Sequence, residues 1–387
     1  MKQYCSVIVF LLFCGLLYSP NLWAKSNLCQ DTQVILDAGS TGTRAYLYQR
    51  DRSGPVGWHL SRHVDQEPGV SSDSTKVATA RVNQLLEQLA ITSETDCIMA
   101  IRIFATGGVR ALNEQKKKEL KYSLEQGLVG HGQVEFTILS GVEEGIYGWV
   151  AVNAAWGSLG KRHEETIGAL DLGGASVQKA VAIDKKDSKQ LKLSNVRIRL
   201  SGKIKMDYRL IVESLPLGQD RIRALTDSQL CIFPDDQVMG KERKSRLRSC
   251  DREIEKAIEI LIKDSGGSVA QVKTKARNDI PEFWGIGAFG YARAEVYSKP
   301  MLLLSEYRLL TEKLCSSSWN KVRRQSKTPD KFLKEACFTG RLVTQLVQKF
   351  SASDDASLYL SVKQGKSIIS WILGVVACAN RCEIQVY

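Results

Sequence analysis

The sequence predicts an α/β protein built from two duplicated lobes, and three observations lead to this fold class. One short motif occurs twice, as Asp37-Ala-Gly-Ser-Thr-Gly-Thr43 and as Asp171-Leu-Gly-Gly-Ala-Ser-Val-Gln178, each time directly after an apolar run. Between and after the two copies, patterns typical of helices alternate with patterns typical of strands. The chain is also longer than one hydrophobic core usually fills. We therefore expect two lobes that face each other across a cleft.

Each copy of the motif is expected to form the turn of a β-hairpin. Strands at 34–36 and 45–48 flank the first turn, and strands at 167–170 and 179–183 flank the second. Glycine allows backbone N–H groups to approach an anion closely, and an Asp at a strand end can hold a divalent cation through water. A single glycine-rich turn is usually only a turn, but two copies in the same context predict a clamp for phosphate and metal.

The remaining elements follow from the period of the apolar residues. In the first block we expect a helix at 76–89, a strand at 97–104, a helix at 113–127 and a strand at 134–139. In the second block we expect a strand at 195–200 and helices at 220–225 and 251–263. The apolar segment 367–378 is too short to span a membrane, so it predicts a buried helix.

The N-terminus is typical of a secretory signal peptide. Lys2 precedes an apolar stretch at 7–18, and Ala24 suits a cleavage site, so residues 1–24 are expected to be removed. An even number of cysteines then remains, which predicts disulfides in an exported chain. These are Cys29, Cys97, Cys231, Cys250, Cys315, Cys337, Cys378 and Cys382. No glycosylation sequon occurs, so we expect a bacterial periplasmic or secreted protein.

The net charge of +12 would attract anionic substrates or surfaces. The basic runs Lys116-Lys-Lys118, Lys241 to Arg248 and Arg323-Arg324 are most simply solvated helix faces. Because they contain few aromatic residues, the sequence argues against a nucleic-acid partner. It also argues against a thiolate metal site, since the chain has only four histidines and no matching Cys-x-x-Cys spacing.

Five segments, in order, resemble the motif series of the apyrases, the ecto-nucleoside triphosphate diphosphohydrolase family. They cover most of the mature chain, and they are Asp37 to Arg44, Ala105-Thr-Gly-Gly-Val-Arg110, Ser140-Gly-Val-Glu-Glu-Gly-Ile-Tyr-Gly-Trp149, Ala169 to Gln178 and Trp284-Gly-Ile-Gly-Ala-Phe-Gly-Tyr291. The resemblance implies two lobes of duplicated RNase H-like (actin/hexokinase-like) fold with the active site in the interlobe cleft. Lobe I would comprise 25–145, with a C-terminal helix at about 364–387 returning to it. Lobe II would comprise 146–363, bind the base and carry disulfides.

The same resemblance implies a hydrolase that removes terminal phosphates from nucleoside tri- and diphosphates with Mg²⁺ or Ca²⁺, as a monomer. Glu144 would be the general base that activates water, while Ser176 and Gln178 would hold that water. Asp37 and Asp171 would hold the cation through water. For Glu143, an alternative stays open, because a carboxylate also suits a helix N-terminus. Trp371 either lies near the metal or packs in the core.

Phosphate oxygens would be bound by backbone amides and hydroxyls of the motif turns. These belong to Ser40, Thr41, Gly42, Thr106, Gly107, Gly174 and Ala175. Tyr291 would stack on the nucleobase. The sequence departs from the family where an arginine often faces that ring, since Gln219 takes its place and leaves Asp220 as a polar contact. The resemblance also implies the disulfides Cys231–Cys250 and Cys315–Cys337, and it leaves Cys29, Cys97, Cys378 and Cys382 open.

Two alternatives stay open from the sequence. The first is a related phosphotransfer enzyme, such as an exopolyphosphatase or a sugar kinase, which the signal peptide and the cysteines disfavour. The second is a catalytically silent protein that binds polyanions through its basic surface, which the set of Asp37, Glu144, Asp171, Ser176 and Gln178 disfavours.

Overall fold

The computed structural model of the chain describes residues 32–51, 57–89, 100–128, 133–184, 194–200, 206–233, 240–266, 269, 281–296, 299–351, 353, 355–365, 367–379 and 382–387. The expected signal peptide, Cys29 and Cys97 lie outside the described residues.

The first sheet has five strands in the order β3-β2-β1-β4-β5. Three antiparallel strands come first, and two strands parallel to β1 follow. The bounds are β1 (Thr32–Ala38), β2 (Thr43–Arg50), β3 (Trp58–Gln66), β4 (Ala100–Ala105) and β5 (Gln133–Ile138). The expected strands and the first hairpin turn are confirmed, with element ends shifted by a few residues.

The second sheet repeats this arrangement within eight strands, in the order β11-β12-β10-β6-β7-β9-β8-β15. Its β6, β7 and β9 are antiparallel, and β10 and β12 run parallel to β6, so these five match the first sheet strand for strand. The bounds are β6 (Gly168–Leu172), β7 (Val177–Ile183), β8 (Ser194–Leu200), β9 (Met206–Leu215), β10 (Phe283–Gly287), β11 (Met301–Leu303), β12 (Ser357–Leu360) and β15 (Cys382–Val386). The expected duplication is confirmed.

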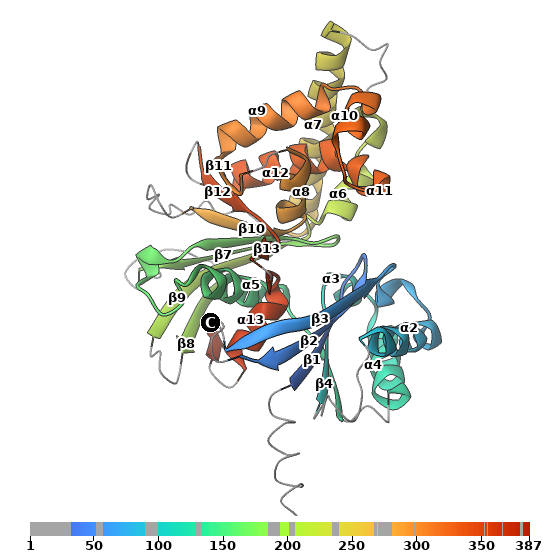
Figure 1. Cartoon of the computed structure of the whole chain (residues 1–387), viewed down its shortest axis with the longest axis vertical. Coiled ribbons are helices and arrows are strands. Elements are labelled where there is room, and N and C mark those ends of the chain that lie inside the picture. Colours follow the sequence, from blue (N-terminus) through green and yellow to red (C-terminus); the bar gives the residue numbers. More distant parts are fainter. Residues whose placement is uncertain are drawn as a thin grey trace, which may run out of the picture.

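The helices cover both sheets and fill the space between them (Figure 1). Beside the first sheet lie η1 (Val70–Ser72), α2 (Thr75–Gln88), α3 (Gly107–Arg110) and α4 (Glu114–Gly127). The second lobe carries η2 (His163–Glu165), α6 (Gln219–Leu225), η4 (Ser228–Cys231), α7 (Gly240–Asp264), α8 (Ala288–Val296), α9 (Leu304–Cys315), α10 (Trp319–Gln325), α11 (Asp330–Leu333) and α12 (Ala336–Phe350). Between the sheets lie α5 (Gly141–Trp156) and α13 (Trp371–Cys378).

The C-terminal segment differs from the expectation in two respects. The segment 367–378 is not one helix, because Ser367–Ile368 forms β14 and pairs with β13 (Lys363–Gln364) before α13 begins. The last strand, β15, pairs with β8 at the edge of the second sheet, so it does not return to the first lobe. An unpaired strand edge favours the addition of one more strand, which accounts for this position. The other lobe boundaries stay a prediction.

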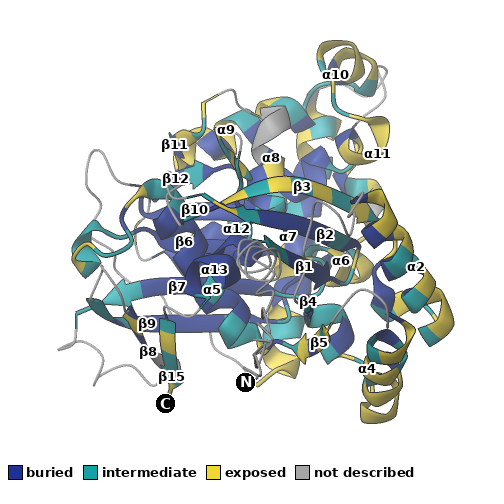
Figure 2. Ribbon diagram, turned by 60° about the horizontal axis from the view of Figure 1, so that its bottom comes forward, coloured by how far each residue is buried: buried dark blue, intermediate teal, exposed yellow. Residues whose placement is uncertain are grey.

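Three large hydrophobic clusters account for most of the packing, and a fourth, smaller one lies among α7, α10 and α11. One large cluster lies between the sheets and joins Ile35 and Tyr46 of the first sheet to Trp149 of α5 and Ile372 of α13. The other two lie on the outer faces, one under α2 and α4 and the other under α7 and α12. Figure 2 shows α5 and α13 as deeply buried helices. The helix that begins with the third motif is therefore held between the two lobes.

Three disulfides lie within the described residues. Cys231–Cys250 and Cys315–Cys337 are the two expected pairs, with S–S distances of 2.04 and 2.09 Å. The third, Cys378–Cys382, joins the end of α13 to β15 at 2.05 Å and resolves two of the cysteines that the sequence left open. None of the described helices has both the length and the apolar character that crossing a membrane requires.

Candidate active site

The two motif turns occupy equivalent positions in the two sheets. Asp37 lies at the end of β1 and pairs in register with Arg44 on β2. Asp171 lies at the end of β6 and pairs in register with Gln178 on β7. Both carboxylates are buried, with 7% and 8% of the residue exposed. Duplication of the fold therefore places two buried carboxylates at matching strand ends.

The turns meet between the lobes. A Cβ atom added to Gly174 would lie 2.8 Å from Ser40 Oγ and 2.8 Å from Thr41 Cγ2. A Cβ atom added to Gly107, in the second motif, would lie 2.9 Å from Ala175 Cβ. Only glycine permits these approaches, since a side chain at either position would collide with the opposite turn. The backbone groups expected to bind phosphate are therefore brought together from both lobes.

Glu144 enters this region from the first turn of α5. The helix begins with a capping box, in which Glu143 N donates to Ser140 Oγ at 3.1 Å and Ser140 N donates to Glu143 Oε2 at 2.8 Å. The open question about Glu143 is thereby answered, because its carboxylate stabilises the helix end. The next residue, Glu144, is only 7% exposed and accepts a hydrogen bond from Arg110 Nη1 at 2.8 Å.

Arg110 connects the general-base candidate to the residues of the opposite lobe. Its Nη1 also donates to the Leu139 carbonyl at 2.9 Å, and its Nη2 donates to Ser176 Oγ at 3.2 Å. The Gln178 amide nitrogen donates to Ser176 Oγ at 2.8 Å and to Ser214 Oγ, on β9, at 3.2 Å. Glu144, Ser176 and Gln178 thus belong to one network of hydrogen bonds.

Burial outweighs the neighbouring arginines and shifts the three carboxylates toward the protonated form. Desolvation raises the pKa of Glu144 to about 7, although the Arg110 guanidinium opposes the shift. Desolvation raises the pKa of Asp171 to about 8, and the charges of Glu144 and Asp37 add to the effect. The pKa of Asp37 is also raised by burial, against the effect of Arg44. Crowded buried carboxylates of this kind are typical of catalytic sites.

This donor set fits a divalent cation. Asp37 Oδ1 is buried and has no hydrogen-bond partner among the described residues, while Oδ2 accepts from Arg44 Nη1 at 3.2 Å. A cation between Asp37 and Asp171 would offset the desolvation that raises both pKa values and the repulsion that adds to the shift of Asp171. Within the described ranges, no three His, Cys, Asp or Glu side chains lie close enough to bind one ion directly. Contact through water, as Mg²⁺ often makes, fits this separation.

The other expected substrate residues lie around the two turns. The Thr106 amide donates to the Ala38 carbonyl at 3.3 Å, which joins the second motif to the end of β1. Gly42 is buried next to the Gln66 carbonyl of β3. The amides of Gln219 and Asp220, at the start of α6, donate to the carbonyls of Gly173 and Gly174 at 2.9 and 3.0 Å. Asp220 therefore lies against the second phosphate turn.

The two aromatic candidates have different surroundings. Tyr291 on α8 is 65% exposed and lies near enough to Arg44 of the first lobe to influence its pKa, so an exposed ring is present beside the first motif. Trp371 is 5% exposed and packs edge-on against Phe104, with 6.2 Å between the ring centroids. Phe104 is the register partner of Asp37 on the adjacent strand, so Trp371 packs in the core on the same face of the sheet as the Asp37 side chain.

Three residues of this region received no role from the sequence. Arg44 and Arg110 are the last residues of the first two motifs, and each forms an ion pair with a carboxylate of the site, Arg44 with Asp37 and Arg110 with Glu144. An arginine at the end of a motif was the signal in the sequence that could have identified them. Ser214 had no such signal, because only the register between β7 and β9 places it opposite Gln178.

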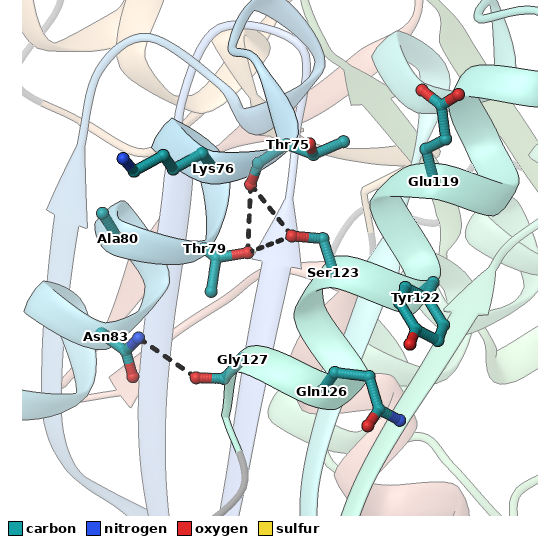
Figure 3. A pocket seen from close by; sticks show the side chains of 10 residues that line it. All are labelled: Thr75, Lys76, Thr79, Ala80, Asn83, Glu119, Tyr122, Ser123, Gln126 and Gly127. Atoms are coloured by element: carbon teal, nitrogen blue, oxygen red, sulfur yellow. Dashed lines mark hydrogen bonds between the residues drawn. The ribbon is translucent and has the colours of Figure 1, made fainter.

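A pocket elsewhere on the molecule contains none of these residues. It has a volume of about 690 Å³ and lies between α2 and α4 (Figure 3). Thr79 and Ser123 share a hydrogen bond of 2.8 Å across it, and Asn83 donates to the Gly127 carbonyl at 3.4 Å. The pocket lies on the outer side of the first sheet, so it is separate from the carboxylates.

Comparison with known sequences gives a consistent result. The sequence model of the GDA1/CD39 (nucleoside phosphatase) family matches residues 27–240. A nucleoside-triphosphatase of Pisum sativum is 31% identical over 214 residues, which are 49% of this chain and 47% of that protein. The chain thus spans about half the length of this relative. Ectonucleoside triphosphate diphosphohydrolase 1 of Mus musculus is 24% identical over 97% of this chain and 87% of its own length.

Solved structures with the same architecture are more distant in sequence. Nucleoside triphosphate hydrolase from Neospora caninum has a TM-score of 0.60 and 13% identity, covering 93% of this chain and 95% of its own. A Ppx/GppA family member from Aquifex aeolicus has a TM-score of 0.55 and 15% identity, covering 90% and 96%. At these identities the likeness concerns the fold alone. The expected two-lobed, actin-like α/β fold is confirmed.

Proposed function

Because the chain belongs to the GDA1/CD39 (nucleoside phosphatase) family, we propose that it is an apyrase-type hydrolase that removes terminal phosphates from nucleoside tri- and diphosphates. The observation that carries this proposal is the convergence of three buried carboxylates, Asp37, Glu144 and Asp171, on the meeting point of two glycine-rich turns. Such turns suit phosphate, and such carboxylates suit a divalent cation and an attacking water.

Glu144 is the general base in this proposal. A carboxyl group with a pKa of about 7 is substantially ionised at neutral pH and is basic enough to accept a proton from water. Arg110 holds the carboxylate in place from one side. Since Arg110 also donates to Ser176, the base and the residue that holds the water are fixed relative to each other.

Ser176 and Gln178 position the attacking water. The amide nitrogen of Gln178 donates both of its hydrogen bonds to serine hydroxyls. The amide oxygen is therefore left to accept a hydrogen bond from the water. Ser176 is not the nucleophile, because its hydroxyl is bound by Arg110 and Gln178 and no described histidine contacts it. Direct attack by water produces no covalent enzyme intermediate.

The phosphate end is formed by the two turns. Backbone amides around Ser40, Thr41, Gly107, Gly174 and Ala175 bind phosphate oxygens, and the Thr41 and Thr106 hydroxyls add donors. Asp37 and Asp171 hold Mg²⁺ or Ca²⁺ through water, with Trp371 in the core nearby. When bound, the cation neutralises charge on the transferred phosphate.

The base end is less specific. Tyr291 stacks on the nucleobase, and stacking on one exposed ring accepts any base. Gln219 stands where a charged contact is frequent in relatives. Asp220 contributes from the start of α6, where it touches the second turn.

The setting of the activity is also part of the proposal. Three disulfides support an exported protein, in the bacterial periplasm or secreted, because disulfides persist in oxidising compartments. We expect a monomer that acts on free nucleotides.

The test is phosphate release from ATP, ADP, UTP and UDP by the purified protein, with Mg²⁺ or Ca²⁺ and then with excess chelator. We expect release from both tri- and diphosphates that stops with chelator. Glu144→Ala should lower kcat by at least about a thousandfold while nucleotide binding persists. Polyphosphate serves as a competing substrate, and its preferential hydrolysis would replace this proposal with the exopolyphosphatase alternative.

A further inference from the structure

Most of the net positive charge of the chain is concentrated in two short stretches. Residues 240–252 and 319–334 contain twelve Lys and Arg but only three Asp and Glu, a net charge of +9 in 29 residues. The whole chain carries +12, so the other 358 residues are nearly balanced. We call these two stretches the basic tip.

The fold joins the two stretches into one surface. The first half of α7, with α10 and α11, packs around a small core made of Phe233, Leu247, Cys315, Val322, Leu333, Ala336 and Cys337. Arg243 of α7 donates to the Ser316 carbonyl just before α10. Disulfides Cys231–Cys250 and Cys315–Cys337 hold the same region. Figure 1 shows α7 and α10 together at the outer end of the second lobe.

Much of this charge is not neutralised within the protein. Arg323 pairs with Asp330 at 2.5 Å, and Lys331 pairs with Glu67 of the first lobe at 3.2 Å. Within the described part of the chain, eight other cations of the tip are exposed and have no acidic partner. They are Lys241, Lys244, Arg248, Arg252, Lys321, Arg324, Lys327 and Lys334.

Helix stability does not account for these residues on α7. Cations near a helix N-terminus oppose the helix dipole, and α7 begins with Lys241, Arg243 and Lys244 around the single acid Glu242. On α10 the basic residues lie in the last turn, where they are favourable. The basic start of α7 thus works against the helix and calls for an external anion.

We propose that the basic tip docks the protein on the surface of an anionic lipid bilayer. α7 and α10 lie together at the outer end of the second lobe, so cations of these two helices can contact one plane, whereas α11 lies nearer the first lobe, where Lys331 pairs with Glu67. Phe332 is 53% exposed between Lys331 and Lys334, and an aromatic ring among cations suits the headgroup region. Single-stranded nucleic acid would need several stacking rings, whereas Phe332 is the one exposed aromatic residue among the described residues of the tip.

This inference goes beyond the proposed hydrolase and does not depend on it. The tip contains none of the residues assigned to the active site. Docking would hold the enzyme at a membrane surface while nucleotides reach the turns between the lobes.

The experiment is co-sedimentation of the full chain with phosphatidylcholine vesicles that contain none or about 30 mol % phosphatidylglycerol. The tip variant reverses four unpaired charges, K241E/K244E/K321E/R324E. The control variant makes the same charge change on α2 and α4 of the other lobe, K76E/K116E/K118E/K121E. All three proteins carry the same apolar N-terminal segment, which can bind vesicles by itself. The comparison therefore uses only the part of the binding that is lost between about 0.05 and 0.5 M NaCl.

We expect binding to the anionic vesicles alone, with affinity reduced at least about tenfold in the tip variant and less than about threefold in the control. Equal losses in both variants would mean that net charge, not the tip, determines binding. No salt-reversible binding, or tighter binding to heparin or duplex DNA than to vesicles, would overturn the proposal. If the tip variant melts early, K321E/R324E on α10 alone replaces it, with K116E/K118E as its control.

Discussion

Raising the pH in the absence of divalent cations should destabilise this protein, and Glu144 should account for a defined part of the loss. The pKa of its carboxyl is about 7 in the folded chain, because burial outweighs the Arg110 contact, and is near 4.5 when exposed. Between these values the folded state holds the proton that the unfolded state has lost. Stability therefore falls as the pH rises through this window, by about 3 kcal/mol at about 1.4 kcal/mol per unit.

The comparison is between wild type and Glu144→Gln, measured by urea unfolding in chelator from pH 4.5 to 8. Glutamine keeps the shape and an acceptor for Arg110 but does not ionise. Wild type should lose about 3 kcal/mol relative to the variant across this range, and excess Mg²⁺ or Ca²⁺ should reduce the loss by neutralising the buried charges. Asp171, with a pKa of about 8, adds a trend in the same direction to both proteins, but a smaller one in the variant, because the Glu144 charge is one cause of its raised pKa. If the stability of the two proteins changed with pH in parallel, the pKa of Glu144 would not be raised in the folded protein, and the reasoning would be refuted.

Three further predictions concern neighbouring features. Glu143→Ala removes half of the capping box and should cost about 1 kcal/mol of stability with kcat nearly unchanged, so a large loss of rate would contradict its structural role. Tyr291→Ala should raise KM with little change in kcat, while Tyr291→Phe should restore KM, and failure of the phenylalanine to do so would exclude stacking. Replacing Cys231 and Cys250 by Ser removes a disulfide that joins residues 19 positions apart, and it should lower the free energy of unfolding in urea by about 3 kcal/mol. An unchanged urea midpoint would contradict this.

Local signals in the sequence were sufficient for most elements. The strands around the first turn, helices α2 and α4 and strand β5 appear where the apolar period placed them, with ends shifted by one or two residues. The helix expected at 251–263 begins earlier, at Gly240. The run Lys241 to Arg248 was interpreted only as a solvated helix face, since the six exposed or half-buried basic and polar residues before Leu247 give little apolar period. The segment 367–378 was also misjudged, because its uniform apolar character does not separate a short strand from a helix.

The duplicated turns and the candidate site residues could be identified from the sequence, because they depend on short-range chemistry: glycine for close approach, and carboxylates and hydroxyls at strand ends. What these groups face depends on how the two lobes pack against each other. The link from Arg110 to Ser176 spans the two lobes, and the raised pKa of Glu144 results from burial. Likewise, each of the two basic stretches of the tip is by itself an ordinary helix face. They form a single surface because both pack around one small core. Long-range contacts and desolvation arise when distant segments pack together, and no local pattern records them.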